Sequence, residues 1–470
     1  MEKINKNIFK AYDIRGIYNE DFDDDDGYKI GRAFAHLIKT EKTTNYKSAT
    51  NLQIEREDKI KVGVARDMRV SSPELYKQVI KGVLDEGVNV VEFDLASTPT
   101  FYFGVAKHTL DGGIQVSASH NPPEYNGFKM TRANAIPISG ETGIMIIRDQ
   151  VLADNFEEVE SKGEVVETLE NLLSEHIAYA FDFFGDVNIK PFKIVVDTAN
   201  AMGGLMFKKF FDKLPCELIH INAELDGTFP AHEADPLKDE NNKQLQDKVL
   251  ETGADLGIAL DGDADRIFFI DNEGKTIEQS IVRGILAKLF LVKNPGATIC
   301  YDIRPGKITE DMILENGGKP VVTKVGHSLI KEKAREVGAV FAGESSGHFF
   351  VKLPFGIFET PMIVSLFLLQ ELSEAGKTVS EYIKPLQRYF HSGEINFSVE
   401  DKDAVFNKLK EIYKENLKYD FDGVTFEWED FWFNVRASNT ESKMRLNLEA
   451  RTKEIMEEKR GEISLVINGK

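Results

Sequence analysis

Three stretches of the chain repeat one plan, in which an apolar run ends in aspartate and is followed by a turn and an amphipathic segment. The runs lie at residues 59–67 (KIKVGVARD), 192–197 (FKIVVD) and 298–302 (TICYD). Their apolar residues are consecutive, as expected of strands that helices cover on both faces. Strands that alternate with helices in this way predict an α/β fold. The unequal spacing of the three stretches indicates similar modules and not a solenoid repeat.

The last part of the chain follows a different pattern. It predicts a strand, a helix over residues 401–415, two short strands and a charged helix that begins near Thr452. This order is typical of an α+β module, which we expect to be joined to the rest through residues 382–388. Near the other end of the chain, the acidic run at residues 21–26 indicates a helix start, and residues 40–57 are predicted to form a surface loop.

Composition excludes several classes of protein. The 470 residues are enough for about three ordinary domains, and their formal net charge is −20. A charge of this sign argues against binding nucleic acid or an anionic membrane over the whole surface. No apolar run reaches the roughly eighteen residues of a membrane span, and no secretion signal opens the chain. Two cysteines cannot make a disulfide framework. We therefore expect a cytoplasmic protein without nucleic-acid or membrane partners.

Residues 261–266 (DGDADR) place three carboxylates in a tight turn between two predicted strands. Like charges this close are unfavourable unless a cation neutralises them, and oxygen ligands suit Mg²⁺ or Ca²⁺. The spacing does not fit an EF-hand, because Arg266 stands where that loop needs glycine and Asn272 where it needs glutamate. We predict a Mg²⁺ site with positions left open for a phosphate, and the alternative is a solvated acidic turn.

A second polar loop follows the predicted strand at residues 113–116. It holds Ser117, Ser119, His120 and Asn121 and is closed by two prolines. A serine in this position can be a nucleophile, a phosphate carrier or only a turn residue. The G-x-S-x-G elbow is missing, which argues against a serine hydrolase. The chain also lacks both common nucleotide-binding signatures, so we expect no nucleotide partner.

Two more loops carry groups suited to a sugar phosphate. Residues 343–348 (GESSGH) offer a carboxylate, hydroxyls and an imidazole for sugar hydroxyls and proton transfer. Residues 436–441 (RASNTE) offer a guanidinium fork, hydroxyls and an amide for a dianion. Taken alone, the first loop could be an ordinary βα-turn and the second a polar hairpin turn.

Taken in order, these loops resemble those of the α-D-phosphohexomutase family, most closely its bacterial phosphomannomutase/phosphoglucomutase branch. The similar segments are residues 9–16 (FKAYDIRG), 117–122 (SASHNP), 261–266, 343–348 and 436–441. They span nearly the whole chain. Small departures are Ser117 where the family usually has Thr, Arg304 where relatives often have Lys, and Ser442 where Pro is common.

The resemblance implies a fold and a reaction. The fold is a heart-shaped molecule of four domains around a central cleft, three related α/β mixed-sheet domains and a C-terminal α+β domain. We place their boundaries at residues 1–152, 153–274, 275–385 and 386–470. The reaction interconverts hexose 6-phosphate and hexose 1-phosphate, of mannose or glucose or both. It passes through a phosphoserine and a hexose 1,6-bisphosphate, which is also the activator.

Two other functions compete with this mutase, and the resemblance does not settle the assembly. One competitor is a metal-dependent phosphomonoesterase that uses the same serine and metal. The other is an acidic Ca²⁺-binding or scaffold protein, which the failed EF-hand spacing disfavours. We expect sugar phosphates as ligands and a monomer or small homo-oligomer.

The resemblance also implies roles for single residues. Ser119 would carry the phosphate and, with Asp261, Asp263 and Asp265, hold Mg²⁺. The other catalytic groups would be Lys129, His348, Arg15 and Arg266. The substrate-binding residues would be Tyr12, Arg304, His327, Glu344, Ser346, Arg436, Ser438, Asn439 and Thr440. We further expect Arg66 and Arg69 to join these cations in a basic cleft that attracts an anionic substrate despite the net charge.

Overall fold

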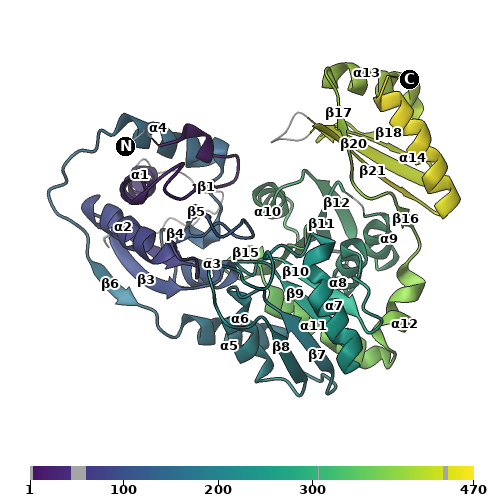
Figure 1. Cartoon of the computed structure of the whole chain (residues 1–470), viewed down its shortest axis with the longest axis horizontal. Helices are drawn as coiled ribbons and strands as arrows, with labels where there is room; N and C mark the ends of the chain where they lie inside the picture. Colours follow the sequence, from purple (N-terminus) through teal and green to yellow (C-terminus); the bar gives the residue numbers. More distant parts are fainter. Residues whose placement is uncertain (1–3, 44–59, 305, 438–442, 470) are drawn as a thin grey trace. The chain divides into compact units, whose positions relative to one another are not determined.

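The computed structural model describes residues 4–43, 60–304, 306–437 and 443–469. The chain divides into two compact units (Figure 1), which are Met1–Thr276 with Phe350–Gly376 and Ile277–Phe349 with Lys377–Lys470. The first unit holds the serine loop and the acidic turn. The second holds the loops at residues 343–348 and at Arg436.

The first unit opens with a six-stranded mixed sheet. Its strands are β1 (Ile14–Ile17), β2 (Lys61–Arg66), β3 (Asn89–Leu95), β4 (Gly112–Val116), β5 (Tyr125–Arg132) and β6 (Val165–Thr168), in the order β1-β5-β4-β2-β3-β6. β2, β3, β4 and β6 are parallel, whereas β5 is antiparallel to β1 and β4. The helices of this domain are α1 (Asp24–Thr43), α2 (Ser72–Asp85), α3 (Thr98–Lys107) and α4 (Met145–Ala153).

Alternate residues of the central strands decide which helix covers which face. Val62 and Val64 of β2 join the apolar core that α1 and α2 share. On the opposite face, Gly113 of β4 lies where a Cβ atom would meet Val105 and Phe101 of α3. The central strands are therefore covered on both faces, which is why their apolar residues are consecutive.

The acidic run starts a helix, as predicted. The Asp23 carboxylate accepts hydrogen bonds from the backbone N–H groups of Asp25 (2.9 Å) and Asp26 (3.2 Å) at the first turn of α1. The surface loop was predicted to begin at Thr40, but α1 continues to Thr43. Residues 40–43 contain no glycine or proline that would end the helix. The rest of that loop, residues 44–57, lies outside the described residues.

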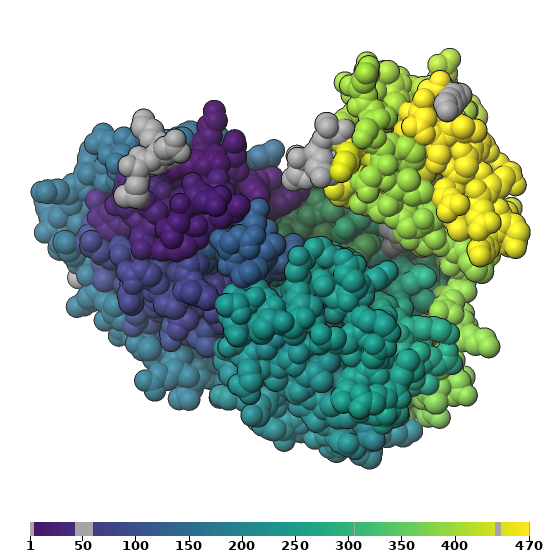
Figure 2. Space-filling view, in the orientation of Figure 1, coloured from purple at the N-terminus to yellow at the C-terminus, as the bar shows by residue number. Residues whose placement is uncertain are grey.

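The second domain of this unit is built on four strands. β7 (Lys193–Asp197), β8 (Glu217–Ile221) and β9 (Leu256–Leu260) are parallel, and β10 (Ile267–Asp271) is antiparallel to β9. Its helices are α5 (Leu172–Phe184), α6 (Gly203–Phe211) and α7 (Lys243–Thr252). In the space-filling view, purple and blue atoms of the first domain lie against the teal atoms of the second (Figure 2). From Phe350 onward, β14 (Phe349–Leu353), β15 (Gly356–Glu359) and α11 (Pro361–Ala375) also belong to this unit.

The second unit begins with a further parallel core. β11 (Thr298–Asp302) lies between β12 (Lys319–Thr323) and β13 (Phe341–Gly343), and both pairings are parallel. Helices α8 (Gln279–Lys293), α9 (Lys307–Glu315) and α10 (His327–Glu336) accompany these strands. β2, β7 and β11 are the three predicted strands, each of which ends at or just before an aspartate, so the three predicted modules are confirmed.

The C-terminal module has more strands than predicted. A linker of α12 (Val379–Ile383) and a short turn leads to β16 (Phe390–His391) and β17 (Ile395–Ser398). Then come α13 (Lys402–Ile412), β18 (Leu417–Tyr419), β19 (Val424–Glu427), β20 (Phe431–Ala437), β21 (Lys443–Ala450) and α14 (Lys453–Ile467). The prediction of two strands after α13 was wrong, because it missed the turn between β18 and β19. Gly423 sits there at φ +84°, and a Cβ atom would lie 2.1 Å from the Val435 carbonyl oxygen.

The chain thus has three α/β domains with mixed sheets and a C-terminal α+β domain, as predicted. Within the part that the structure describes, no helix is both long enough and apolar enough to cross a membrane.

Candidate active site

Ser119 lies in the loop after β4, in a backbone conformation that few non-glycine residues adopt. Its φ is +53°, and only 2% of its surface is exposed. Its N–H donates to Ser117 Oγ at 3.0 Å, so the preceding serine shapes the turn. Its hydroxyl donates to Asp261 Oδ2 at 3.2 Å and lies 3.1 Å from His120 Nδ1. The hydroxyl is therefore held beside the acidic turn.

Asp261, Asp263 and Asp265 lie in the turn between β9 and β10, all buried. They can each offer one carboxylate oxygen within 4.8 Å of the others. Gly262 lets this turn approach the serine, because a Cβ atom there would lie 2.2 Å from the Ser119 carbonyl oxygen. The two loops are thus packed backbone to backbone.

The carboxylates of this turn are balanced by Lys129 of β5. Its ammonium group donates to Asp263 and, at 2.7 Å, to Asp265 Oδ2. Burial opposes the lysine charge, but these two carboxylates raise the pKa of Lys129 well above its ordinary value. Burial and the neighbouring carboxylates raise the pKa of Asp261, whereas Lys129 and Thr98 outweigh burial and lower the pKa of Asp263. The three carboxylates thus crowd one buried turn, where like charges oppose one another and a cation beside them is favourable.

The residues of this turn fit a divalent cation. Hard carboxylate oxygens are the ligands that Mg²⁺ prefers. Asp263 Oδ1 is buried and has no hydrogen-bond partner among the described residues, so one carboxylate oxygen is left for a metal. Ser119 Oγ, 3.2 Å from Asp261, lies where a phosphate on the serine could reach the same ion.

Cationic and imidazole groups surround the serine loop. Arg15 of β1 donates to Asn121 Oδ1 at 2.8 Å and pairs with Asp13 at 2.7 Å. Arg266 pairs with Asp235 at 3.5 Å. Burial, and then the charges of Arg266 and Arg15, lower the pKa of His120 well below its ordinary value, so this ring is neutral at neutral pH. His120 was not predicted as a functional residue, although it directly follows Ser119 in the sequence. Tyr12 is half-buried just before β1.

The structure does not place Arg69 in a basic cleft. None of its surface is exposed, and its guanidinium donates to backbone carbonyl groups. The prediction for Arg69 was therefore wrong, because its guanidinium faces main-chain carbonyl groups and not an open surface. Arg66 pairs with Asp94 at 2.7 Å.

In the second unit, residues 343–348 join β13 to β14, so this loop is a turn between strands and not a βα-turn. Glu344 Oε1 accepts from the Gly326 N–H at 2.8 Å, and Ser346 Oγ lies 2.9 Å from His348 Nδ1. His327 stacks on His348 with ring centroids 5.9 Å apart. Burial would raise the pKa of Glu344, but the hydrogen bond from His348 and the charge of Arg304 lower it. The predicted sugar-reading groups are thus close to one another.

A buried chain of ion pairs supports this loop, and of its members only Arg304 was predicted as a site residue. Asp302, at the end of β11, accepts from Arg283 of α8 at 2.6 Å and from Arg304 at 2.5 Å. It also accepts from the N–H of Ser345 at 3.2 Å. Arg283 and Asp302 have no exposed surface. A lone arginine within an apolar helix pattern gives little signal from which its partner could be found.

The predicted phosphate loop is described only in part. Arg436, near the end of β20, is buried and donates to Glu394 Oε2 at 2.9 Å. Burial would raise the pKa of Glu394, but Arg436 and Arg445 lower it. Ser438, Asn439 and Thr440 lie outside the described residues.

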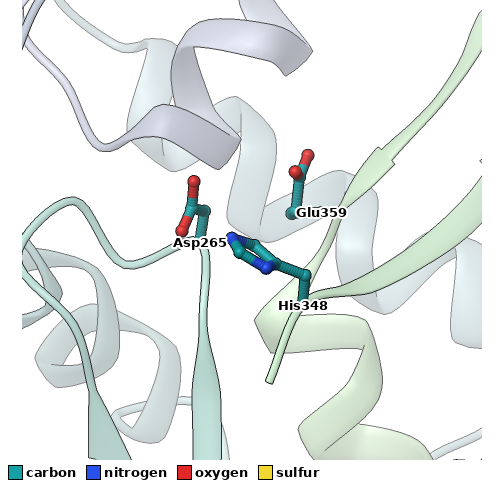
Figure 3. Close-up of side chains that lie close together, drawn as sticks. All are labelled: Asp265, His348 and Glu359. Atoms are coloured by element: carbon teal, nitrogen blue, oxygen red, sulfur yellow. The ribbon is translucent and has the colours of Figure 1, made fainter. Parts of the chain in front are cut away.

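Figure 3 draws three side chains of these regions. Asp265, on the loop before β10, and Glu359, at the end of β15, belong to the first unit, and His348, just before β14, belongs to the second. Glu359 is fully buried, and burial followed by its charge raises the pKa of Tyr102 well above the ordinary value. No motif in the sequence pointed to Glu359.

Comparisons with known proteins agree along the whole chain. Family models described as phosphoglucomutase/phosphomannomutase α/β/α domains I, II and III match residues 6–158, 171–274 and 280–389. The C-terminal domain model matches residues 394–465. A phosphomannomutase of Methanocaldococcus jannaschii is 36% identical over 98% of this chain and 97% of its own. A phosphomannomutase of Vibrio cholerae is 35% identical over 94% of each chain.

Solved structures give the same match. A phosphoglucomutase/phosphomannomutase family protein from Burkholderia thailandensis superposes with a TM-score of 0.87 at 30% identity. The superposition covers 99% of this chain and 98% of that one.

Proposed function

Because the chain belongs to the phosphoglucomutase/phosphomannomutase family of α-D-phosphohexomutases, we propose that it interconverts hexose 6-phosphate and hexose 1-phosphate. The proposed substrates are mannose and glucose phosphates. One observation carries the proposal, namely the Ser119 hydroxyl held 3.2 Å from Asp261 in a buried turn of three carboxylates. A serine that only shaped a turn would not need this acidic, buried surrounding.

In the proposed cycle, Ser119 carries a phosphoryl group between turnovers. The P–O bond to Ser119 Oγ breaks as a bond forms to the free hydroxyl of the hexose phosphate, whose proton leaves to a base. The resulting hexose 1,6-bisphosphate then presents its other phosphate. The P–O bond to the hexose breaks as a bond forms to Ser119 Oγ, and the freed sugar oxygen takes up a proton in exchange for the one that the serine hydroxyl loses. Donor and acceptor are both phosphate esters, so no nucleotide is consumed. An external hexose 1,6-bisphosphate would load the serine initially.

The chain's own residues supply positioning and charge, which are the main needs of phosphoryl transfer. Asp261, Asp263 and Asp265, with the serine phosphate, would bind Mg²⁺, which neutralises charge on the transferring group. Lys129, charged at neutral pH, and Arg15 can donate hydrogen bonds to phosphoryl oxygens. Proton transfer has two candidates, Lys129 and His348.

For the second unit we propose substrate recognition. Glu344 and Ser346 would bind sugar hydroxyls, because their oxygens lie together in a rigid turn. Arg436, with Ser438, Asn439 and Thr440, would bind the phosphate that does not react. Arg304 and His327 would add charge and hydrogen bonds to the same substrate. Tyr12 and Arg266 are proposed as further contacts on the first unit.

A coupled assay tests the proposed function. Mannose 1-phosphate, glucose 1-phosphate and N-acetylglucosamine 1-phosphate are each offered with Mg²⁺ and catalytic glucose 1,6-bisphosphate. We expect the 6-phosphates of mannose and glucose to form, with a lower rate for the N-acetylated sugar. Formation of no 6-phosphate from any substrate contradicts the mutase. Stoichiometric release of inorganic phosphate instead supports a phosphomonoesterase.

A further inference from the structure

The guanidinium of Arg69 contacts the main chain of the serine loop. The residue lies shortly after β2 and has no exposed surface. Its two terminal nitrogens donate four hydrogen bonds, all to main-chain carbonyl oxygens, three in the loop after β4 and one at the first residue of β5. The acceptors are Ser119 (2.9 Å), Asn121 (2.5 Å), Pro122 (2.6 Å) and Tyr125 (2.9 Å). The backbone carbonyls on both sides of His120 therefore point at one guanidinium.

Only arginine can make this set of contacts. A guanidinium presents five donors in a fixed plane, whereas a lysine ammonium presents three donors from one atom. Without Arg69 these carbonyl groups would lose a charged donor in or near the interior, which is unfavourable, although Pro122 O also accepts from the Tyr125 N–H at 3.1 Å. The buried charge of Arg69 is matched by Asp67, whose carboxylate lies 3.3 Å from Nε and also accepts from the Arg69 N–H at 3.0 Å.

The contacts of Arg69 fall on a strained part of the backbone. Ser119 has a φ of +53°, which the surroundings must hold in place. Its carbonyl oxygen is fixed on one side by Arg69 Nη2 and packs on the other against Gly262 of the acidic turn. The position of the Ser119 hydroxyl beside Asp261 thus depends on where Arg69 holds the carbonyl of the same residue.

A segment of the second domain, residues 226–235, packs on the far side of Arg69. The ring of Phe229 lies over the guanidinium, with its centroid 5.0 Å from the central carbon. Gly227 allows this approach, because a Cβ atom there would be 2.8 Å from Arg69 Cα. Farther along, Ala234 O accepts from the Gly262 N–H at 3.2 Å. One segment therefore contacts both Arg69 and the acidic turn.

We propose that Arg69 is a positioning residue for phosphoryl transfer, which holds the Ser119 loop in register with the three aspartates. It acts through the main chain of the loop and does not touch the substrate. The inference rests on the proposed role of Ser119. Loss of Arg69 should slow phosphoryl transfer but not weaken substrate binding, because the groups proposed to bind the sugar phosphate remain.

The test compares Arg69→Lys with Arg32→Lys in the full chain. Arg32 is a matched control, because it also pairs with a carboxylate (Glu86, 3.1 Å), donates to a backbone carbonyl (Glu157, 2.8 Å) and lies under a ring (Phe156, 4.7 Å). Its contacts are with α2 and the chain after α4, not with the serine loop. We measure kcat, the Kd of glucose 1-phosphate by calorimetry, and amide hydrogen exchange over residues 117–126.

We expect Arg69→Lys to lower kcat on the order of 100-fold, since misplacing a reacting group by about 1 Å has effects of this size. The Kd should stay within about twofold, and exchange of the loop amides should rise, because the loop then opens more often. Arg32→Lys should leave all three within about twofold. A kcat for Arg69→Lys within threefold of wild type, or a tenfold weaker Kd at unchanged kcat, overturns the proposal.

Two safeguards keep the test decisive. If Arg69→Lys does not fold, Phe229→Leu is the second variant, because it removes the ring over Arg69 and keeps its hydrogen bonds. It should lower kcat less than Arg69→Lys while raising amide exchange in the same loop. Unchanged kcat and exchange would contradict the proposal.

If the wild type itself has no mutase activity, the proposed function fails. The exchange data then still decide whether Arg69 holds the loop.

Discussion

The serine loop of the first unit and the loop at residues 343–348 of the second are both held by a buried arginine, but through different partners. Arg69 binds four main-chain carbonyls directly. Arg283 binds Asp302, and Asp302 in turn accepts from the backbone N–H of Ser345 at 3.2 Å and from its Oγ at 3.0 Å. The first loop is held through its main-chain carbonyl groups. The second is held through the side chains of Arg283 and Asp302.

We interpret this difference as one between positioning of Ser119 and the substrate recognition proposed for residues 343–348. A loop held by its carbonyls keeps one reactive hydroxyl in place, whatever side chains surround it. A loop held through Asp302 is tied to Arg304 as well, since the same carboxylate accepts from Arg304 Nε at 2.5 Å. We therefore expect changes in the first loop to affect kcat and changes in the second to affect substrate binding.

Removal of metal gives the largest expected difference between the two loops. The serine loop lies beside three buried carboxylates that fit Mg²⁺. Treatment with EDTA should lower the mutase rate at least about 100-fold, because a bound cation contributes several kcal/mol to phosphoryl transfer. Mg²⁺ should restore the rate.

The matching variants are Asp263→Asn and Asp255→Asn. Asp255 is an exposed aspartate just before β9, so its change should leave the Mg²⁺ requirement as it is. Asp263→Asn should raise the Mg²⁺ concentration needed for half-maximal rate. Full activity in EDTA would show that the acidic turn is not a metal site.

The next largest effect should come from Asp302→Asn, which leaves Arg283 without its buried counter-ion. Breaking one half of a buried pair costs about 3–5 kcal/mol of stability. Burial opposes ionisation of Asp302, but Arg304 and Arg283 lower its pKa, so its charge is present at neutral pH. Denaturant unfolding measures the change. Asp94→Asn, which breaks the exposed pair with Arg66, should cost less than about 1 kcal/mol, and equal losses would contradict a buried support.

A smaller effect is expected for Ser345→Ala. The hydroxyl bonds to Asp302 and lies 3.1 Å from Arg283, while the backbone N–H of Ser345 still holds the loop. We expect a loss of about 1 kcal/mol in stability and a KM raised a few fold, with kcat within twofold. Ser365→Ala is the control, because its hydroxyl also hydrogen-bonds within the protein, to Pro361 O at 2.8 Å, and does not touch residues 343–348. A fall in kcat with KM unchanged would remove the distinction between the loops.

The smallest effect concerns pH. His232, in the segment that packs on Arg69, pairs with Asp197 at 2.9 Å. Burial lowers its pKa, but the hydrogen bond and charge of Asp197 outweigh burial and raise it. A raised folded-state pKa means that the pair stabilises the fold below the unfolded pKa of about 6.5, and that this contribution is lost as pH rises through the folded value.

The stability difference between wild type and His232→Gln should therefore be larger at pH 5.5 than at pH 8.5, by less than about 1 kcal/mol. Denaturant unfolding at the two pH values measures it. The loop at residues 343–348 offers a control in Ser345→Ala, whose cost should be alike at both. A difference for His232 that grows with pH would have the wrong sign.

Much of the fold could be predicted, because parallel strands covered on both faces leave consecutive apolar residues in the sequence. β2, β7 and β11 were found in this way. The strand pair β18 and β19 was missed, although Asp422-Gly423 is a hairpin signal, because the flanking strands are short and mixed in polarity.

Only those site residues could be predicted that lie in loops with a recognisable sequence motif. Arg69 and Arg283 are buried, and the loop carbonyls that Arg69 contacts and the Asp302 carboxylate that Arg283 contacts are distant in the sequence, so no periodicity marks these contacts. The net charge of −20 did not prevent local cations from gathering, since Arg15 and Lys129 lie with the acidic turn. Arg69, expected among those cations, donates instead to main-chain carbonyls around Ser119.

The central claim is that Ser119 carries the phosphoryl group, and peptide mass spectrometry tests it most directly. The chain is incubated with glucose 1,6-bisphosphate and Mg²⁺, digested and mapped, with Ser119→Ala treated in parallel. We expect one stable phosphate, on Ser119, and none in the variant. A phosphate on Ser117 instead, or equal labelling of the variant, would contradict it.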